Sequence, residues 1–377
     1  MLPVTLDLYG FIEVDVGYER GQSNPDWFDV ARPSKLPTTP DEFGRDGRTF
    51  ASVRPSRVGA KLNMPSAAGD IRATLEADAF GSDNNVGQTA FRLRLASIES
   101  ERFGAGLTWS PFTDGGIFPA SLEFFGPPGI TKLRNILVYW RPLNDGNRFT
   151  IALERPGATG DGGIYADRID LQDVHLRFPL PDLTTAYRWT LPHGHLQLAA
   201  VARTIQIDDD SAATATPETR IHGWGASLSG SIEADPDDQL KWEAVYGAGV
   251  ENYVNDAPVD VAARTRTTNS GTSATAAALP VLGLTAFLEH SWSPRWSSIA
   301  GYSLERITNS NAQTPQAFHR GEYALLSLVR SPAPGLKYGA ELQWVRRASA
   351  DNGFAVSDLR LQFTVRLNFE GSFTLTK

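Results

Sequence analysis

The chain has no cysteine and only two methionines among its 377 residues. Without thiols it can form no disulfide framework, thiolate metal site, iron–sulfur cluster or cysteine nucleophile. Lysine and arginine number 35 against 43 acidic residues, and this net charge of −8 argues against a general nucleic-acid binder. Long apolar runs are missing too, since the least polar stretch, residues 276–288, is shorter than the roughly 20 residues of a membrane-spanning helix. A helical membrane protein is excluded, but a membrane barrel is not.

The N-terminus lacks the pattern of a secretory signal, because Asp7 interrupts it before any apolar stretch can form. We therefore expect that any such signal has been removed or was never part of this chain.

What the chain has instead is strict alternation of apolar and polar residues. In its last segment Leu359, Leu361 and Phe363 alternate with Arg360, Gln362 and Thr364, so one face of a strand is apolar and the other polar. The 34 glycines and 24 prolines supply many turns. Sixteen segments of this kind can be distinguished, near residues 4–18, 56–64, 71–80, 91–99, 103–112, 134–142, 148–156, 182–191, 195–207, 223–234, 240–253, 279–292, 296–308, 322–331, 336–348 and 357–369.

The connectors between these segments alternate between short turns and long loops. This sorting is typical of an up-and-down barrel with one rim in a confined space and the other facing outward. Charged strand faces cannot all lie in a dry core, so they must line water while the apolar faces meet lipid or protein. The sequence predicts an all-β, sixteen-stranded antiparallel transmembrane β-barrel over residues 1–369, with short periplasmic turns and long extracellular loops. Residues 370–377, after the aromatic Phe369, are predicted to form a C-terminal tail.

Several motifs of the first third of the chain carry a family resemblance. They include Leu8-Tyr9-Gly10-Phe11-Ile12, Ser56-Arg57-Val58-Gly59, Gly106-Leu107-Thr108-Trp109-Ser110-Pro111-Phe112 and Ser121-Leu122-Glu123-Phe124-Phe125-Gly126-Pro127. In these stretches the chain resembles the DcaP-like trimeric outer-membrane porins. The resemblance implies a homotrimer in the bacterial outer membrane, surrounded by its lipid and lipopolysaccharide, that takes up small anionic solutes such as dicarboxylates.

The third long connector, residues 113–133, is too apolar for a solvated outer loop, since it contains Phe118, Phe124 and Phe125. The resemblance implies that it folds into the barrel and narrows it. With its rings packed on the inner wall, Asp114, Glu123 or Lys132 would face the passage. The alternative is a loop that caps the outer rim or packs at a subunit contact.

Alternation also places basic side chains on the water-lined faces. The predicted pore-lining set is Arg57, Lys61, Arg72, Arg92, Arg94, Arg134, Arg203, Arg360 and Arg366, with Asp114 and Glu123 from the third connector. A basic wall concentrates anions and binds carboxylates or phosphates through charge-assisted hydrogen bonds. We therefore expect a passive diffusion channel with a mild preference for anions. In the alternative interpretation these arginines only neutralise wall and loop carboxylates.

Two other classes of barrel protein stay open. A barrel enzyme would need a nucleophile beside a histidine, and none of the six histidines lies in such a motif. His193 and His195 fall in a predicted tight turn, so we expect no metal site, no cofactor and no catalytic residue. A structural or adhesin barrel with a plugged lumen fits the same strands, although small residues such as Gly104 and Ser229 leave space in the predicted lumen.

Overall fold

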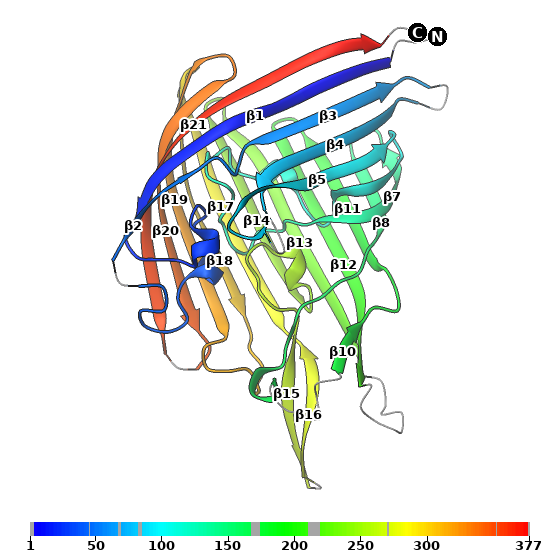
Figure 1. The fold of residues 1–377 in the computed structure, drawn as a ribbon. Helices are drawn as coiled ribbons and strands as arrows, with labels where there is room; N and C mark the ends of the chain where they lie inside the picture. Colours follow the sequence, from blue (N-terminus) through cyan, green and yellow to red (C-terminus); the bar gives the residue numbers. More distant parts are fainter. Residues whose placement is uncertain are drawn as a thin grey trace.

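The structure is a computed structural model that describes residues 4–44, 46–66, 69–81, 85–166, 174–209, 219–269, 271–351 and 353–375. Within these ranges, sixteen strands form a closed antiparallel barrel, as predicted (Figure 1). Its wall consists of β1 (Val4–Glu19), β3 (Arg57–Met64), β4 (Ile71–Phe80), β5 (Thr89–Glu99), β6 (Phe103–Trp109), β7 (Arg134–Asn144), β8 (Arg148–Glu154), β11 (Asp182–Leu191), β12 (Gly194–Asp209), β13 (Thr219–Asp235), β14 (Asp238–Ala248), β17 (Pro280–Ser293), β18 (Trp296–Ile307), β19 (Phe318–Ala333), β20 (Leu336–Ser349) and β21 (Ala355–Leu375).

Each wall strand pairs with its neighbours in sequence, and the first and last strands close the barrel. β1 and β21 are in register from Val4 opposite Leu375 to Glu19 opposite Arg360. The other edge of β1 pairs with β3 near the termini and with the short β2 (Arg48–Ser52) near its far end. Because every wall strand has a partner on both sides, the backbone polar groups are satisfied within the sheet, as a lipid environment requires.

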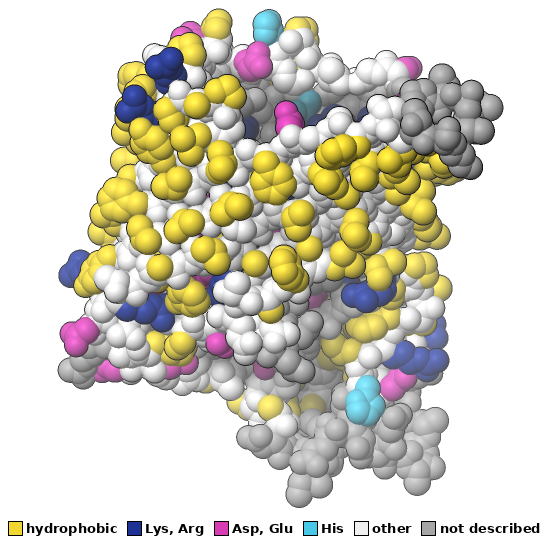
Figure 2. Space-filling model, turned by 45° about the horizontal axis from the view of Figure 1, so that its top comes forward, with side chains coloured by type: hydrophobic (Ala, Val, Ile, Leu, Met, Phe, Trp, Pro, Cys, Tyr) yellow, Lys and Arg dark blue, Asp and Glu magenta, His cyan; other side chains and the backbone are white. Residues whose placement is uncertain are grey.

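The alternation seen in the sequence separates a wet inner face from an apolar outer face. On β21 the side chains of Leu361, Phe363 and Val365 are exposed on the outer surface, whereas those of Arg360 and Gln362 are buried inside. Figure 2 shows the result on the face in view, an apolar band with charged side chains mainly beyond its two margins. Such a band is the lipid-facing surface of an outer-membrane barrel.

The two ends of the barrel differ. One end has the short turns and both termini, and the other has the long loops, from which β15 (Val261–Thr268) and β16 (Gly271–Ala278) project as a hairpin (Figure 1). The loops also contain β9 (Gly160–Asp161), β10 (Val174–Arg177) and the 3-10 turns η1 (Pro25–Trp27), η2 (Pro33–Lys35), η4 (Gly115–Ile117), η5 (Gly163–Tyr165) and η7 (Glu251–Tyr253). Among the described residues, no helix has the length and apolar character needed to cross a membrane.

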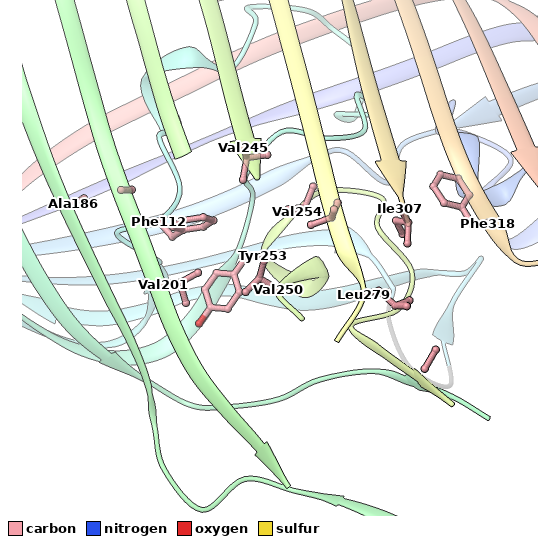
Figure 3. Close-up of a cluster of buried hydrophobic side chains, with 13 residues drawn as sticks. Phe112, Ala186, Val201, Val245, Val250, Tyr253, Val254, Leu279, Ile307 and Phe318 are labelled. Carbon is pink, nitrogen blue, oxygen red and sulfur yellow. The ribbon is translucent and has the colours of Figure 1, made fainter. Parts of the chain in front are cut away.

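The largest group of buried apolar side chains lies inside the barrel, where loops pack on the inner wall. Val250, Tyr253 and Val254 come from the sixth loop (residues 249–279) and pack with Phe112 and with wall residues such as Val245 (Figure 3). The lumen is therefore partly filled by loop side chains near its long-loop end.

Several predicted boundaries differ from the structure, among them those of β14, β6 and β21. β14 ends at Ala248 rather than near residue 253, because Gly249 takes a left-handed conformation (φ 68°) and a 3-10 turn follows. β6 ends at Trp109, since Pro111 provides no backbone N–H for a ladder. The expected C-terminal tail is strand as far as Leu375, because β1 supplies a pairing edge down to Val4, and residues 376–377 lie outside the described part.

Candidate permeation pathway

Four charged side chains of β4 and β5 form a connected set on the inner wall. The guanidinium of Arg94 lies 2.8 Å from Glu76 and 2.8 Å from Asp78, and that of Arg92 lies 2.7 Å from Asp78. Arg57 of β3 approaches Glu76 at 3.6 Å. Both carboxylates are buried, so each is held by charge-assisted hydrogen bonds rather than by bulk water.

Arg134, the first residue of β7, adds positive charge to this set. Its charged neighbours include Arg94, Arg92 and Asp78, and its guanidinium stands 5.3 Å from the ring centre of Trp109. Among the described residues it forms no ion pair, and its Nη1 atom is buried without a hydrogen-bond partner. Four arginines therefore face two carboxylates on this wall, which leaves a surplus of positive charge. We call Arg57, Arg92, Arg94 and Arg134 the upper arginines.

Lys132 of the third loop approaches the same region. Its Nζ atom lies 3.9 Å from the ring centre of Phe125 and 5.7 Å from that of Phe124. Burial, reinforced by the charges of Arg32 and Arg134, lowers the pKa of Lys132 well below its ordinary value. An anion close to Lys132 would favour its charged form.

A second group of arginines lies nearer the short-turn end. Arg148 of β8 and Arg188 of β11 are directly opposite each other in the sheet, and Arg141 of β7 is beside them. We call these three the lower arginines. They line a cavity of about 260 Å³ together with Thr113, Gly115 and Gly116 of the third loop. A further cavity of about 600 Å³ at the short-turn end is lined by Arg141, Arg148 and Arg72, and also by the acidic residues Asp70, Glu99 and Glu101.

Arg141 and Arg148 were absent from the predicted set. Neither has a carboxylate partner among the residues that the structure describes. The alternation that places Glu154 inward on β8 also places Arg148 inward, so this signal was present in the sequence. Arg141 follows the inward residue Tyr139 by two positions, next to a bulge that starts at Trp140.

The third loop (residues 113–133) begins with an anchored turn. The carboxylate of Asp114 accepts hydrogen bonds from Ser229 at 2.7 Å, from the Gly116 N–H at 3.0 Å and from Arg188, and it lies 2.8 Å from His195 Nε2. Burial alone would raise its pKa, but the His195 hydrogen bond and the Arg188 charge outweigh burial and lower the pKa of Asp114. Asp114 is thus buried in a contact with the wall rather than free in the passage.

The middle of the third loop contacts inward side chains on the opposite wall. The Ala120 N–H donates to Glu289 of β17 at 2.7 Å, and the Leu122 N–H donates to Glu341 of β20 at 2.7 Å. Lys241 of β14 donates to the Phe118 carbonyl at 3.0 Å. Wall carboxylates therefore hold the loop by its backbone, and they satisfy N–H groups that would otherwise be unpaired.

The return half of the third loop passes close to the wall at a pair of glycines. A Cβ atom on Gly283 of β17 would lie 2.1 Å from the Gly129 carbonyl oxygen, and Gly129 itself has a positive φ of 70°. Only glycine permits this approach. Further along, Thr131 donates to Glu243 of β14 through both its N–H and its hydroxyl, at 2.8 and 2.6 Å.

Glu123, like Asp114, is buried. It accepts the Gly126 N–H at 2.7 Å within its own loop. Burial, reinforced by the carboxylate of Glu341, raises the pKa of Glu123 to about 8. Of the two loop carboxylates that the sequence suggested for the passage, neither is exposed.

Part of the first loop (residues 20–56), around residues 27–36, also packs against the inner side of the barrel, which the sequence did not indicate. Arg360 of β21 donates to the Phe28 carbonyl at 3.0 Å, and Arg54 pairs with Asp29 at 3.1 Å. The ring of Phe80, at the end of β4, stacks on Phe124 of the third loop at 4.1 Å, and Trp27 of the first loop packs beside it. The apolar residues within 27–36 could have predicted this position, because the same apolar character distinguishes the third loop from a solvated loop.

The remaining predicted residues have mixed positions. Arg203 is fully enclosed between Asp182 and Asp260, at 3.2 and 3.1 Å. Arg360 is enclosed by the first loop, and Arg366 bridges Glu13 and the Leu122 carbonyl. These three arginines fasten loops to the wall. Lys61 lies half-buried over the ring of Tyr9, and Arg72 is exposed in the cavity at the short-turn end.

The hydroxyl of Ser229 and the ring of His195 both contact Asp114, which stands between them. A nucleophile relay needs the histidine in the middle position, so these three side chains are not arranged as one. Among the described residues no three histidine, aspartate or glutamate side chains are grouped as a metal-binding set.

Comparisons with known proteins agree with this geometry. A profile of the DcaP outer membrane protein family matches residues 4–262. The crystal structure of the outer membrane channel DcaP of Acinetobacter baumannii superposes with a TM-score of 0.78 at 17% identity and covers 97% of both chains. The chain is also similar to an anion-selective porin from Comamonas acidovorans, with a TM-score of 0.57 at 10% identity over 97% of this chain and 100% of that one.

OmpT of Vibrio cholerae, an outer membrane protein, gives a TM-score of 0.55 at 11% identity over 97% of this chain and 98% of that one. Comparison with curated protein sequences gives no match. At these identities the structural likeness establishes the fold, whereas the family profile covers more than half of the sequence. The chain therefore belongs to the DcaP outer membrane protein family, whose members are channel proteins of the bacterial outer membrane.

Proposed function

We propose that this porin is a passive diffusion channel with a preference for small anions, above all dicarboxylates. The observation that supports this preference is the unequal charge on the inner wall, where the four upper arginines face two carboxylates. Both of those carboxylates are already paired, and the partly exposed side chains of Arg57 and Arg92 are the members of this set that can meet a passing anion.

The lower arginines form a second basic set, and the cavity of about 260 Å³ that they line contains no acidic side chain among its lining residues. Arg141 and Arg148 have no carboxylate partner among the described residues, and Arg188 is held in place by Asp114 and Gln197. A dianion that leaves the upper arginines can therefore pass to a second set of donors. Weak sites in series allow an ion to bind and also to leave, which conduction requires.

The third loop is proposed as the constriction. Its backbone is held by Glu341, Glu289 and Glu243 of the wall, and its two carboxylates are buried away from the passage. The loop thus narrows the lumen without placing free negative charge in it, which favours anions over cations of the same size.

The functional unit is proposed to be a homotrimer. The outward positions of β3 and β4 include Ala60, Ala73, Ala77 and Ala79, whose small side chains allow a neighbouring subunit to pack closely. Native mass measurement in detergent tests this assembly. A trimer mass is expected, and a monomer as the only species would refute it.

Liposome swelling tests the proposed solute class. Vesicles containing the purified porin should swell fastest with a four-carbon dicarboxylate, more slowly with a neutral diol of the same length, and slowest with the matching diamine. Equal rates would contradict the charge preference. No swelling with any solute would instead identify a plugged barrel, the alternative favoured by the loops inside the lumen.

A further inference from the structure

Three arginines form a row on the outer surface of β18, β19 and β20, at the end that bears the long loops. Arg306 lies directly opposite Arg320, and Arg346 lies opposite Glu322. Ile307 next to Arg306, Val345 next to Arg346 and Tyr323, three positions after Arg320, are buried on the inner side of the wall. Because side chains alternate along a strand, Arg306, Arg320 and Arg346 project outward, away from the lumen.

Glu322 orients two of these arginines. Its carboxylate lies 2.9 Å from Arg320 and 2.8 Å from Arg346, and it also accepts the hydroxyl of Tyr302. The carboxylate is nearly covered, with 8% of its side chain exposed, whereas 41% and 40% of the two arginine side chains are exposed. Arg306 is exposed and has no carboxylate partner among the described residues. One carboxylate therefore balances only one of the three positive charges, and several guanidinium N–H donors face outward.

The position of this row relative to the lipid follows from strand geometry. On β19 the outward residues between Arg330 and the Arg320–Glu322 pair are Leu328, Leu326 and Ala324, all apolar. Ten residues at about 3.3 Å each span roughly 33 Å along the strand, and a tilt of about 40° reduces this to roughly 25 Å. That height equals the apolar band of an outer-membrane barrel.

Arg330 marks the other margin of the band. It stands 5.3 Å from the ring centre of Trp296 and 6.0 Å from that of Tyr338, in an aromatic girdle at the short-turn end. The row of three arginines then lies at the opposite margin, level with the headgroups of the outer leaflet. The leucines below it, among them Leu326 and Leu342, are exposed and can receive acyl chains.

We propose that Arg306, Arg320 and Arg346 bind the phosphate groups of a phosphorylated lipid of the outer leaflet, of the lipopolysaccharide type. Arginine suits this role because its planar fork can donate two hydrogen bonds to one phosphate. The apolar surface directly beneath favours a lipid over free phosphate, since only a lipid gains from covering it. The site is on the outer surface, so it is independent of the selectivity of the channel.

The test is native mass spectrometry of the porin in detergent, titrated with lipid A that carries its phosphates. Replacing all three residues with serine (R306S, R320S and R346S together) should weaken binding roughly 100-fold, since each arginine near such a surface contributes about a fivefold factor. The matched control removes three arginines at the short-turn end (R102S, R295S and R330S) and should leave binding unchanged. A thermal unfolding scan shows whether both variants remain folded.

A second variant tests the site in the opposite direction. Glu322→Gln removes the only carboxylate of the row and should strengthen binding about fivefold. Lipid A without phosphates should bind weakly to the parent protein, and inorganic phosphate should not displace the intact lipid. Equal binding by the triple serine variant and the parent would overturn the proposal. So would equal binding of the phosphate-free lipid, or displacement of the lipid by inorganic phosphate.

Discussion

Arg134 and Arg148 are the most informative pair of arginines to remove. Each lies on the proposed anion path, one in the upper and one in the lower set, and neither forms an ion pair among the described residues. Arg92 and Arg94 are less suitable, because removing them would leave Glu76 and Asp78 buried without their partners. The double variant Arg134→Gln with Arg148→Gln therefore subtracts charge without creating an unpaired buried carboxylate.

The expected size of the effect comes from the charge removed. A unit charge about 4 Å from a passing ion in water is worth about 1 kcal/mol, which changes the local ion concentration about fivefold. Salt screens this interaction energy when the ion and the charge are farther apart. We expect the anion-to-cation permeability ratio of the double variant to fall several-fold, with its unfolding temperature unchanged.

Arg203→Gln is the matched control. Arg203 is enclosed between Asp182 and Asp260, away from both cavities, so its loss should cost about 3 to 5 kcal/mol of stability and leave selectivity as it was. Permeability ratios come from reversal potentials of single channels, and stability from unfolding in detergent. If Arg203→Gln alters selectivity as much as the double variant does, the positive wall has been assigned to the wrong residues.

Three further expectations concern the barrel and the third loop. Leu361→Arg should reduce the free energy of unfolding in lipid by about 2 to 4 kcal/mol, because Leu361 lies midway between the two margins of the apolar band. Ser357→Arg should reduce it by only about 0 to 1 kcal/mol. Equal reductions would contradict the assigned membrane depth. Deleting residues 116–129 should raise single-channel conductance, and an unchanged conductance in a folded variant would place the constriction elsewhere. Because burial beside Glu341 raises the pKa of Glu123 from 4.5 to about 8, the free energy of unfolding should fall as pH rises from about 4.5 to about 8, and Glu123→Gln should flatten this pH dependence. An identical slope in the variant would assign the titration to another group.

The barrel was predictable because its signal is local. Period-two alternation and the sorting of loop lengths depend only on neighbouring residues, so the strand number and their faces follow from sequence. The limits of that signal show at strand ends. β21 continues to Leu375 because β1 offers a pairing edge, and this is a contact between the two ends of the chain.

The site was predictable only in part, because alternation gives the face of a residue and not its surroundings. It placed Arg57, Arg92 and Arg203 on the same face, yet Arg203 is enclosed by the carboxylates of β11 and the sixth loop. Arg134 stands at a strand start beside the third loop, where its long side chain reaches the inner arginines even though Ile136 and Val138 point outward. The packing of loops inside a wide lumen depends on long-range contacts such as that of Phe80 with Phe124, which no local pattern reveals.

The most direct test of the account is the zero-current potential of a single channel in a planar bilayer with unequal KCl on its two sides. The inner wall is positively charged and the carboxylates of the third loop are buried, so chloride should permeate more readily than potassium. The zero-current potential should therefore have the sign of the chloride equilibrium potential, and it should be smaller in the Arg134→Gln, Arg148→Gln variant. A potential of the sign set by potassium in the parent protein would contradict the account.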